Sequence, residues 1–473
     1  MDAKEKDRIY NELVANILAA RYEDIDQATV SIIKTCILDA IGCALGSAKL
    51  PDILALVEMV AEWGGKKEAS IIGHGIQAPV HDVAFVNCTM CRGFDRAVGA
   101  YIFNNRVAPH HASETLTPAA VALGESKGIN GKELIVALAV GDDLTARLHL
   151  ANDHPLPGEY HPQERSAPIR LPQYKIPTPT FGAAAMAGRI LGLTPLQLKN
   201  TLGLVGNSEG FGGGIPDGAP TFKIGQGTMA RGGIISALMA KKGWTGAIDP
   251  FFDPGAGLFS DRLDHPEMLT KDLGKNFYVE DVFKLYPGGW PTQAPTAAAI
   301  EISNKYHLKT ADIEEVILRT SPGISTATHY ARPYKVGVYP TGDALFSYKY
   351  AVANALVRGT ARNKDYTEEA VRDPEVQALI KKVKLALAEL SASEGVELEV
   401  KMKDGSRFNQ RVARAHGEPS SPLSKDTLIS KFMEQVEFTQ IISQKKAEKM
   451  IELIQNLEDV DNVSKILELS VKG

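Results

Sequence analysis

The spacing of apolar residues restricts the fold of this chain more than any other feature of its sequence. Within residues 26–45, apolar side chains recur every three or four positions, at Val30, Ile33, Ile37 and Ile41. This spacing places side chains on one face of an α-helix, so it predicts a core helix. Similar periodicity continues to about residue 265. We therefore expect the first half of the chain to be mostly helical.

Residues that commonly begin helices support this interpretation. Asn130 precedes an apolar-periodic run, and its side chain is suited to accept a hydrogen bond from a free backbone amide. Thr194 and Pro195 stand at the start of another run, where proline is favoured at the first helical position. Residues 225–243 predict a further buried helix, because their small side chains permit close packing.

The pattern changes after about residue 275. Residues 313–321 alternate between apolar and polar side chains, as in a half-buried strand. Residues 396–402 alternate in the same way before Asp404-Gly405, a pair typical of hairpin turns. Residues 367–387 are expected to be helical, so this section is α+β. Amphipathic helices return beyond Pro422.

The order of these sections predicts the domain organisation. A chain of 473 residues is too long for one ordinary core, so two or more domains are expected. The simplest arrangement is a mostly α fold in which residues 1–268 and 422–473 form one all-helical domain. Residues 269–421 would then form an α+β lid domain inserted between the two ends.

Charge and hydropathy exclude several classes of partner. The net charge is −5, and no basic cluster with interleaved aromatic residues is present, so we expect no nucleic-acid or membrane-surface partner. The charged N-terminus lacks the apolar segment of a signal peptide. No apolar run is expected to approach the roughly 20 residues that a membrane span needs. The expected location is the cytoplasm.

The four cysteines are too few for a disulfide framework in so long a chain. Cys88 and Cys91 form a C-x-x-C pair, but a zinc site would need a second pair of ligands at similar spacing. A thioredoxin-like motif would need a strand over residues 80–87. Buried structural thiols are the favoured interpretation, with a redox or metal role as the alternative.

Residues 92–113 gather the most chemistry in the shortest stretch. Its polar and charged residues include Asp95, Arg96, Arg106, His110 and His111. They precede a predicted helix, and the N-terminus of a helix attracts anions and supports acid–base residues. On the residues alone, however, an adjacent histidine pair is more often structural or solvated than functional.

Other stretches offer weaker signals. Lys223 follows a glycine-rich loop, where it would either bind a substrate carboxylate or be exposed. Gln293 and Thr292 could supply hydrogen-bond donors for an anion at the start of a helix. Tyr350 lies at the edge of an apolar helix, where a buried tyrosine with a satisfied hydroxyl is the usual explanation. Residues 151–180 are too rich in proline for a helix or a central strand, and a loop of this length is usually a lid, an insertion or a disordered segment.

Several segments occur together in an order that resembles the MmgE/PrpD family. They include "DAIGCALGS", "HASETLTPAAVALGES", "YPGGWPTQAPTAAAIEI" and "FSYKYAVANALVRG". Members of that family include 2-methylcitrate dehydratase, cis-aconitate decarboxylase and iminodisuccinate epimerase. The resemblance implies a helical domain formed by both chain ends, an α+β lid domain, a homodimer and a cleft between the domains. It also implies no metal or organic cofactor.

The resemblance also implies the roles of particular residues. His111 matches the histidine of the family's H-P-S element, and Tyr350 matches the tyrosine of its F-S-x-x-Y element. Asp95 matches the middle aspartate of the M-D-F-D-D-T segment, and Lys223 lies three residues after the position of a family lysine. Gln293 stands where the family has a histidine.

The family's substrates are small di- and tricarboxylic acids, from which a proton moves at a carbon next to a carboxylate. Such a step needs a base, an acid and donors for the carboxylates. We therefore hypothesise that His111 is the general acid/base, Tyr350 a proton donor or orienting group, and Lys223 a third catalytic residue. Substrate contacts are assigned to Asp95, Arg96, Arg106, His110 and Gln293.

The expected reaction is a cofactor-free lyase step on a small carboxylic acid, with dehydration preferred over decarboxylation. The first alternative is an epimerase or isomerase that removes and returns a proton, using His111 and Lys223 on opposite faces of one carbon. The second alternative is a non-catalytic homologue that binds an acid.

Overall fold

The computed structural model describes residues 1–103, 106–108, 111–152, 178–205, 219–255, 257–260, 263–320, 330–387 and 395–471. The side chains of residues 103, 106–108 and 387 lie outside this description. Most of the proline-rich segment and of the glycine-rich loop falls outside it as well.

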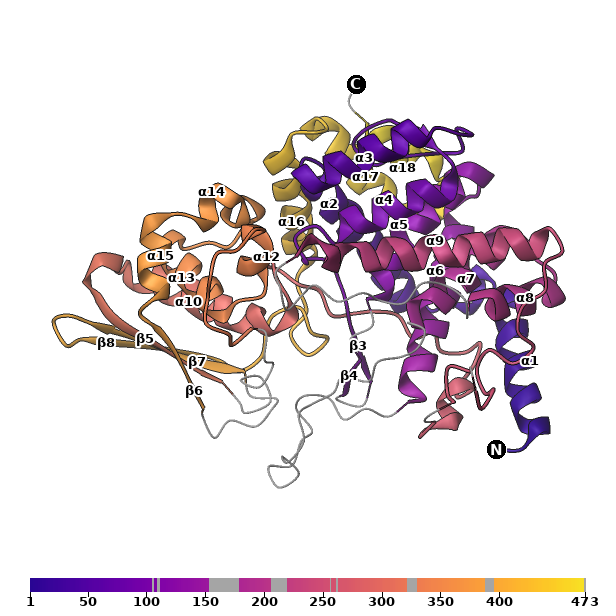
Figure 1. Ribbon diagram of the computed structural model, residues 1–473, viewed down its shortest axis with the longest axis horizontal. Helices are drawn as coiled ribbons and strands as arrows, with labels where there is room; N and C mark the ends of the chain where they lie inside the picture. The colour runs from indigo at the N-terminus through magenta and orange to yellow at the C-terminus, as the bar shows by residue number, and fades with distance from the viewer. Residues whose placement is uncertain are drawn as a thin grey trace.

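A large helical part occupies one side of the molecule, shown in indigo to magenta with yellow helices in Figure 1. Its helices from the first half of the chain are α1 (Ala3–Ala19), α2 (Gln27–Ser47), α3 (Pro51–Trp63), α4 (Val80–Cys91), α5 (Ala112–Lys127), α6 (Gly131–Leu150), α7 (Thr178–Ile190), α8 (Pro195–Val205) and α9 (Ile224–Lys241). The last section of the chain adds α16 (Lys425–Thr439), α17 (Gln444–Gln455) and α18 (Ser464–Leu469). Two short antiparallel pairs join β1 (Ala69–Ser70) to β2 (Gln77–Ala78) and β3 (Tyr101–Phe103) to β4 (Arg106–Ala108).

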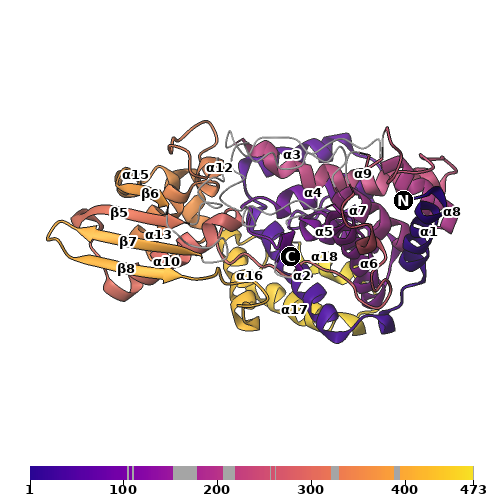
Figure 2. The same cartoon turned by 90° about the horizontal axis from the view of Figure 1, so that it is seen from below.

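A smaller α+β part, orange in Figure 1, is built on one sheet with the strand order β6-β5-β7-β8. The strands are β5 (Ile313–Thr320), β6 (Val383–Leu387), β7 (Val396–Met402) and β8 (Arg407–Val412). The helices are α10 (Gln293–Tyr306), α12 (Pro340–Leu345), α13 (Tyr348–Arg358), α14 (Glu368–Val371) and α15 (Pro374–Ile380). α10 packs on β7 and β8, and α13 packs on α10 and α15. Figure 2 shows the sheet extending away from the helical part.

Local sequence signals explain most of these elements. The side chain of Asn130 accepts a 2.9 Å hydrogen bond from the amide of Glu133 and caps α6 as expected. Thr194 likewise accepts from the amide of Gln197 at the start of α8. The predicted hairpin is confirmed, because β7 and β8 are antiparallel and Gly405 takes φ 87° in the turn between them.

One local alternative finds no support in the structure, and one local prediction was wrong. Residues 80–87, considered as a strand for a thioredoxin-like motif, form the first two turns of α4, which is buried along most of its length. The end of the stretch 367–387, expected to be helical, is β6. Its residues pair in parallel with β5, with Val383 opposite Val316, so tertiary pairing overrides the local helical pattern.

In the described part of the chain, one helix is long and apolar enough to cross a membrane by length and composition. This helix is α2, with a mean hydropathy of 1.7, so the expectation that no apolar run approaches such a length was wrong. However, 72% of its most apolar window is buried inside the structure, where α2 packs on α4, α5 and α16. This is the environment of a core helix.

The helical part and the α+β part are each built around a large cluster of buried hydrophobic residues. The larger draws its residues from positions 9–279 and 432–467, and the smaller mostly from positions 294–415. Phe94 and Phe222 belong to the smaller cluster although they come from the helical part, and Phe222 meets Phe346 edge-on at 5.0 Å. The mostly helical fold with a small sheet is confirmed. The exact assignment of residues to two domains stays a prediction, which this division of the clusters supports.

Candidate active site

The site is built around the first turn of α5, where His111 is the N-cap. His111 has φ 55° and ψ 38°, so its backbone is left-handed, and its amide donates a 3.4 Å hydrogen bond to the carbonyl of Gly99. A Cβ atom at position 99 would lie only 2.6 Å from Nδ1 of His111. The glycine therefore gives the imidazole the room to lie against the backbone.

The capping of α5 comes from a distant carboxylate. Glu280 accepts hydrogen bonds from the amides of Ala112 at 3.0 Å and Ser113 at 2.7 Å. The amide of Glu280 in turn donates to Asp142 on α6 at 2.8 Å. A carboxylate at this end satisfies free amides and favours the helix dipole, so Glu280 fixes the turn that carries His111.

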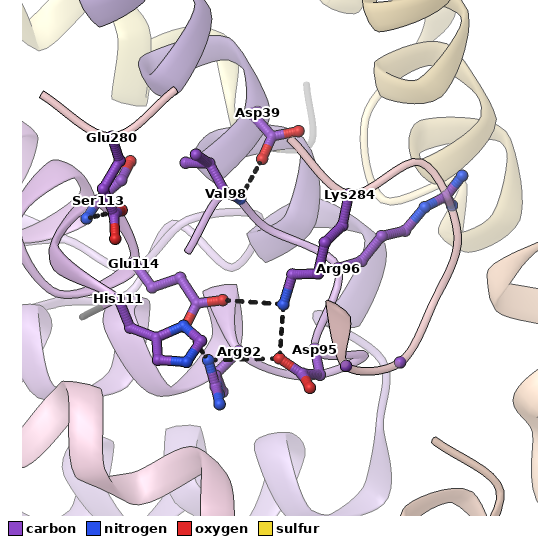
Figure 3. A network of polar contacts seen from close by, with 12 residues as sticks. Asp39, Arg92, Asp95, Arg96, Val98, His111, Ser113, Glu114, Glu280 and Lys284 are labelled. Atoms are coloured by element: carbon purple, nitrogen blue, oxygen red, sulfur yellow. Dashed lines mark hydrogen bonds and ion pairs between the residues drawn. The ribbon is translucent and has the colours of Figure 1, made fainter. Parts of the chain in front are cut away.

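His111 lies within a compact group of charged side chains (Figure 3). Its Nδ1 is 2.7 Å from a guanidinium nitrogen of Arg92 and 3.4 Å from a carboxylate oxygen of Glu114. The same nitrogen of Arg92 donates to Glu114 and lies 3.3 Å from Asp95. The ammonium of Lys284 completes the group at 2.7 Å from Asp95 and 3.9 Å from Glu114. We call these five residues the charged cluster.

The side chain of His111 is more exposed than those of the other members of the charged cluster. The side chains of Arg92, Asp95 and Lys284 are each 3% exposed and that of Glu114 is fully buried, whereas 29% of the His111 side chain is exposed. Nδ1 faces Arg92 and Gly99, so these two residues occupy one edge of the ring and leave Nε2 without either contact. His111 is thus the most exposed member of the charged cluster.

The charges of the cluster shift the pKa values of its members. Burial by itself raises the pKa of Glu114, but Arg92, His111 and Lys284 outweigh it and lower that pKa to about 2. Burial and the neighbouring Arg92 lower the pKa of His111 below its ordinary value, although Glu114 opposes the shift. His111 is therefore neutral at neutral pH, while Glu114 is ionised.

The smaller part of the molecule also approaches the cluster. Tyr330, ten residues before α12, is buried, and its pKa is raised well above the ordinary value by burial and by the charge of Asp95, with Arg92 opposing. Its ring lies 5.5 Å from that of Tyr348 at the start of α13. The charged cluster therefore lies where the helical part meets the α+β part.

A lysine in the last section of the chain binds the segments that carry members of the charged cluster. The buried ammonium of Lys431 on α16 donates to Asp39, to the carbonyl of Arg96 at 2.8 Å and to that of Lys284 at 2.7 Å. Asp39 also accepts from the amide of Val98 at 2.9 Å. One lysine thus ties α2 to the segments that carry Asp95 and Lys284.

Arg96 has a structural environment. Its guanidinium makes two 3.0 Å bonds to Glu434, one of 3.0 Å to Asn363 and one of 2.8 Å to the carbonyl of Leu285. The guanidinium of Arg96 is thus hydrogen-bonded to other groups of the protein. The geometry therefore does not support the predicted substrate contact. The residue joins α16 to the loop before α10.

Gln293 is likewise engaged inside the protein. Its carbonyl oxygen accepts from the amides of Leu285 and Tyr286, both at 3.0 Å, and its amide nitrogen donates to the carbonyl of Tyr286 at 2.9 Å. The side-chain amide of Gln293 is therefore occupied by backbone groups, so the geometry does not support its predicted substrate contact. Thr292 donates to the carbonyl of Gly289 at 2.8 Å.

Tyr350 is not brought next to His111 by any contact within the described residues. It is fully buried in the smaller cluster, and its hydroxyl donates to the carbonyl of Asp365. Its ring stacks on Tyr334 and meets Tyr366 edge-on. This satisfied hydroxyl fits the structural explanation better than the proton-donor hypothesis.

Lys223 binds residues that do not belong to the charged cluster. Its ammonium lies 2.7 Å from Asp52 on α3 and 2.5 Å from the hydroxyl of Tyr339, just before α12. The side chain is fully buried, and burial lowers its pKa, although Asp52 opposes the shift. Lys223 therefore links the two parts of the molecule, and its predicted catalytic role stays a hypothesis.

The other predicted residues divide into two groups. Asp95 is a member of the charged cluster, with its backbone at φ 48°. The side chain of Arg106 and the whole of His110 lie outside the described residues. Their substrate contacts stay predictions.

Sequence reasoning missed Glu114 and Lys284. Glu114 follows His111 by three positions on a predicted helix, a spacing that places two side chains on one face and could have revealed it. Lys284 is separated from Asp95 by 189 positions, so no local sequence pattern could have predicted their contact.

All four cysteines are free and buried, as the structural interpretation expected. Within the described ranges, no group of three or more His, Cys, Asp or Glu side chains is arranged to hold a metal ion.

Comparison with known proteins places this geometry in context. Residues 11–268 match the MmgE/PrpD N-terminal domain, and residues 286–459 match the MmgE/PrpD C-terminal domain. Human cis-aconitate decarboxylase is 25% identical over 421 residues, which cover 84% of this chain and 80% of the relative. Cis-aconitate decarboxylase of Aspergillus terreus is 21% identical over 505 residues, covering 99% and 97% of the two chains.

Proposed function

Because this chain belongs to the MmgE/PrpD family, we propose that it is a cofactor-independent lyase that moves a proton next to a carboxylate of a small di- or tricarboxylic acid. The observation that carries the proposal is the position of His111. It is a neutral, partly exposed imidazole held at a helix N-terminus by buried charges. Relatives at modest identity carry the name cis-aconitate decarboxylase, which supports lyase chemistry.

His111 can serve in either of two lyase reactions, a dehydration or a decarboxylation. In a dehydration, neutral Nε2 accepts the proton from the carbon next to the carboxylate, the electrons form the double bond, and the hydroxyl leaves as water once it gains a proton. In a decarboxylation, the carbon–carbon bond breaks, CO2 leaves, and protonated His111 gives its Nε2 proton to the carbon that retains the electron pair. In both reactions His111 is the positioned acid–base group, and the dehydration also needs an acid that gives a proton to the leaving hydroxyl.

The names of the relatives favour decarboxylation, whereas the lowered pKa of His111 favours proton removal, because it keeps the imidazole neutral. Arg106 and His110 lie five positions and one position before His111 in the chain and remain our candidates for carboxylate binding. A homodimer and a cytoplasmic location remain part of the proposal.

An epimerase would need a second group on the opposite face of the substrate carbon. Lys223 was the candidate, but its ammonium is paired with Asp52 and Tyr339. This pairing gives the epimerase no support over the lyase. A non-catalytic homologue would bind an acid without converting it.

The test is a panel of di- and tricarboxylic acids, with their amino and imino analogues, screened by thermal shift. A ligand at 100 times its Kd adds about 2.7 kcal/mol of apparent stability, which makes binding easy to detect. Each acid that binds is then incubated with the protein in D2O and followed by proton NMR. We expect a product that has lost CO2 or water.

Deuterium uptake without either loss would identify an epimerase instead. Binding of acids with no change to any of them would identify a non-catalytic homologue. Either result would overturn the lyase proposal.

A further inference from the structure

Nδ1 of His111 faces two groups of opposite hydrogen-bonding character. The guanidinium of Arg92, at 2.7 Å, only donates hydrogen bonds. The carboxylate of Glu114, at 3.4 Å, only accepts them while it is ionised. The imidazole thus lies between a donor and an acceptor that are themselves hydrogen-bonded to each other.

We propose that Glu114 is a positioning residue that makes His111 a base, by taking the hydrogen bond of its Nδ1–H and leaving Nε2 unprotonated. This proposal rests on the proposed function, because it specifies how the same histidine handles its proton. Glu114 has no counterpart among the site residues that the family resemblance implies. It acts through His111 and does not itself touch the substrate.

The two tautomers of neutral His111 correspond to the two partners. When Arg92 donates to Nδ1, the proton resides on Nε2, and the accessible nitrogen is a hydrogen-bond donor. When Nδ1–H donates to Glu114, the accessible Nε2 is unprotonated and can accept a proton from carbon. The 3.4 Å separation needs to shorten by only a few tenths of an ångström to enter the usual range of a hydrogen bond.

The surroundings keep Glu114 available as an acceptor. It is fully buried, and the charges of Arg92 and Lys284 keep its pKa far below that of a histidine. Its charge therefore stays constant while His111 titrates. Asp95 and Lys284 pair with each other at 2.7 Å, and Tyr330 faces Asp95 and Arg92 as a neutral phenol.

The charge of Glu114 also stabilises the protonated state of His111. Once Nε2 has taken a proton, the imidazolium lies beside Arg92, which repels it, and beside Glu114, which attracts it. Without the carboxylate charge of Glu114, the repulsion from Arg92 and from Lys284 would remain without that opposing attraction. Proton binding to His111 would then weaken, and the Nε2–H tautomer would be favoured.

The experiment is nitrogen-15 NMR of the full chain labelled at histidine, because the two ring nitrogens report tautomer and protonation directly. The signal of His111 is assigned by its absence in His111→Asn. In Glu114→Gln we expect His111 to bind its proton at least tenfold more weakly and to shift towards Nε2–H. Glu434→Gln, which removes the carboxylate partner of Arg96 instead, is the matched control and should leave the His111 signals unchanged.

Unchanged His111 titration and tautomer in Glu114→Gln would overturn the proposal. If that variant does not fold, Glu114→Asp decides, since it keeps the charge but withdraws it by one methylene. There we expect a smaller change in the same direction, and no change would overturn the proposal. The measurement needs no substrate, so it stands apart from the test of lyase activity: a response without turnover would refute the proposed function alone.

Discussion

Gly99 and His111 are in direct contact, and the absence of a side chain on Gly99 is what permits it: a Cβ there would lie 2.6 Å from Nδ1 of the imidazole. Gly99→Ala should therefore displace the ring while leaving the buried charges in place. A misplacement of about 1 Å at a catalytic group costs on the order of 100-fold in rate. We expect a loss of that size in kcat/KM on the acid that the protein converts.

Gly255→Ala is the control for this substitution, because the nearest atom to its added Cβ lies at an ordinary 3.4 Å. It should leave kcat/KM unchanged. Wild-type kcat/KM in Gly99→Ala would show that the position of the His111 ring does not matter for the reaction.

The pH dependence of stability should report on His111. Its pKa in the folded protein is lowered by burial and by Arg92, whereas in the unfolded chain it is about 6.5. Between these two values the unfolded chain binds more protons, so the contribution of His111 to stability is complete above about pH 6.5 and declines as the pH falls. Tm measured from pH 8 to pH 5 should fall more steeply in the wild type than in His111→Asn.

The half-buried His74 has a pKa lowered by burial in the same direction, so the comparison must be between the two proteins and not within one. Parallel curves for the wild type and His111→Asn would be inconsistent with a neutral, partly buried His111.

Lys431 should be important for stability, because its buried ammonium binds Asp39 and two carbonyls. Lys431→Met leaves the carboxylate of Asp39 buried without its cation, and breaking such a pair costs about 3–5 kcal/mol. Unfolding by urea should show a loss of this size. Lys465→Met removes an exposed lysine that pairs with Asp461, and it should change stability by no more than about 0.5 kcal/mol. Equal effects of the two substitutions would contradict the structural role of Lys431.

Tyr339→Phe tests the link between the two parts of the molecule. It removes one hydrogen bond, which the ammonium of Lys223 donates to the hydroxyl of Tyr339, and leaves the pair of Lys223 with Asp52 intact. The expected loss of unfolding free energy is about 1 kcal/mol, measured by urea unfolding. A loss above about 3 kcal/mol would mean that the contact between Tyr339 and Lys223 contributes more to the free energy of unfolding than one hydrogen bond does.

Local patterns in the sequence predict the elements of this fold well, because caps and periodicity act over a few residues. Asn130 begins α6, and Gly405 turns the hairpin between β7 and β8, as expected. β6 could not be predicted in this way, because its conformation depends on pairing with β5, which lies about 70 positions earlier in the chain.

The site was predicted only in part for the same physical reason. His111 and Asp95 were identified, and Glu114 was within reach of a helical-spacing argument. Arg96 has the chemistry expected of a substrate-binding residue, but Glu434, 338 positions away, occupies its guanidinium. Contacts over such separations are set by the fold, so a residue type alone does not reveal whether it is free for a ligand.

The central claim is that His111 transfers the proton, and its most direct test is kcat/KM of His111→Asn against the wild type. Asparagine tolerates the left-handed backbone at φ 55°, so the fold should be kept. His307→Asn is the matched control, since His307 also has a left-handed backbone, at φ 47°, and caps the end of α10. We predict a loss of at least about 100-fold in His111→Asn and no loss in His307→Asn. Turnover by His111→Asn at the wild-type rate would contradict the claim.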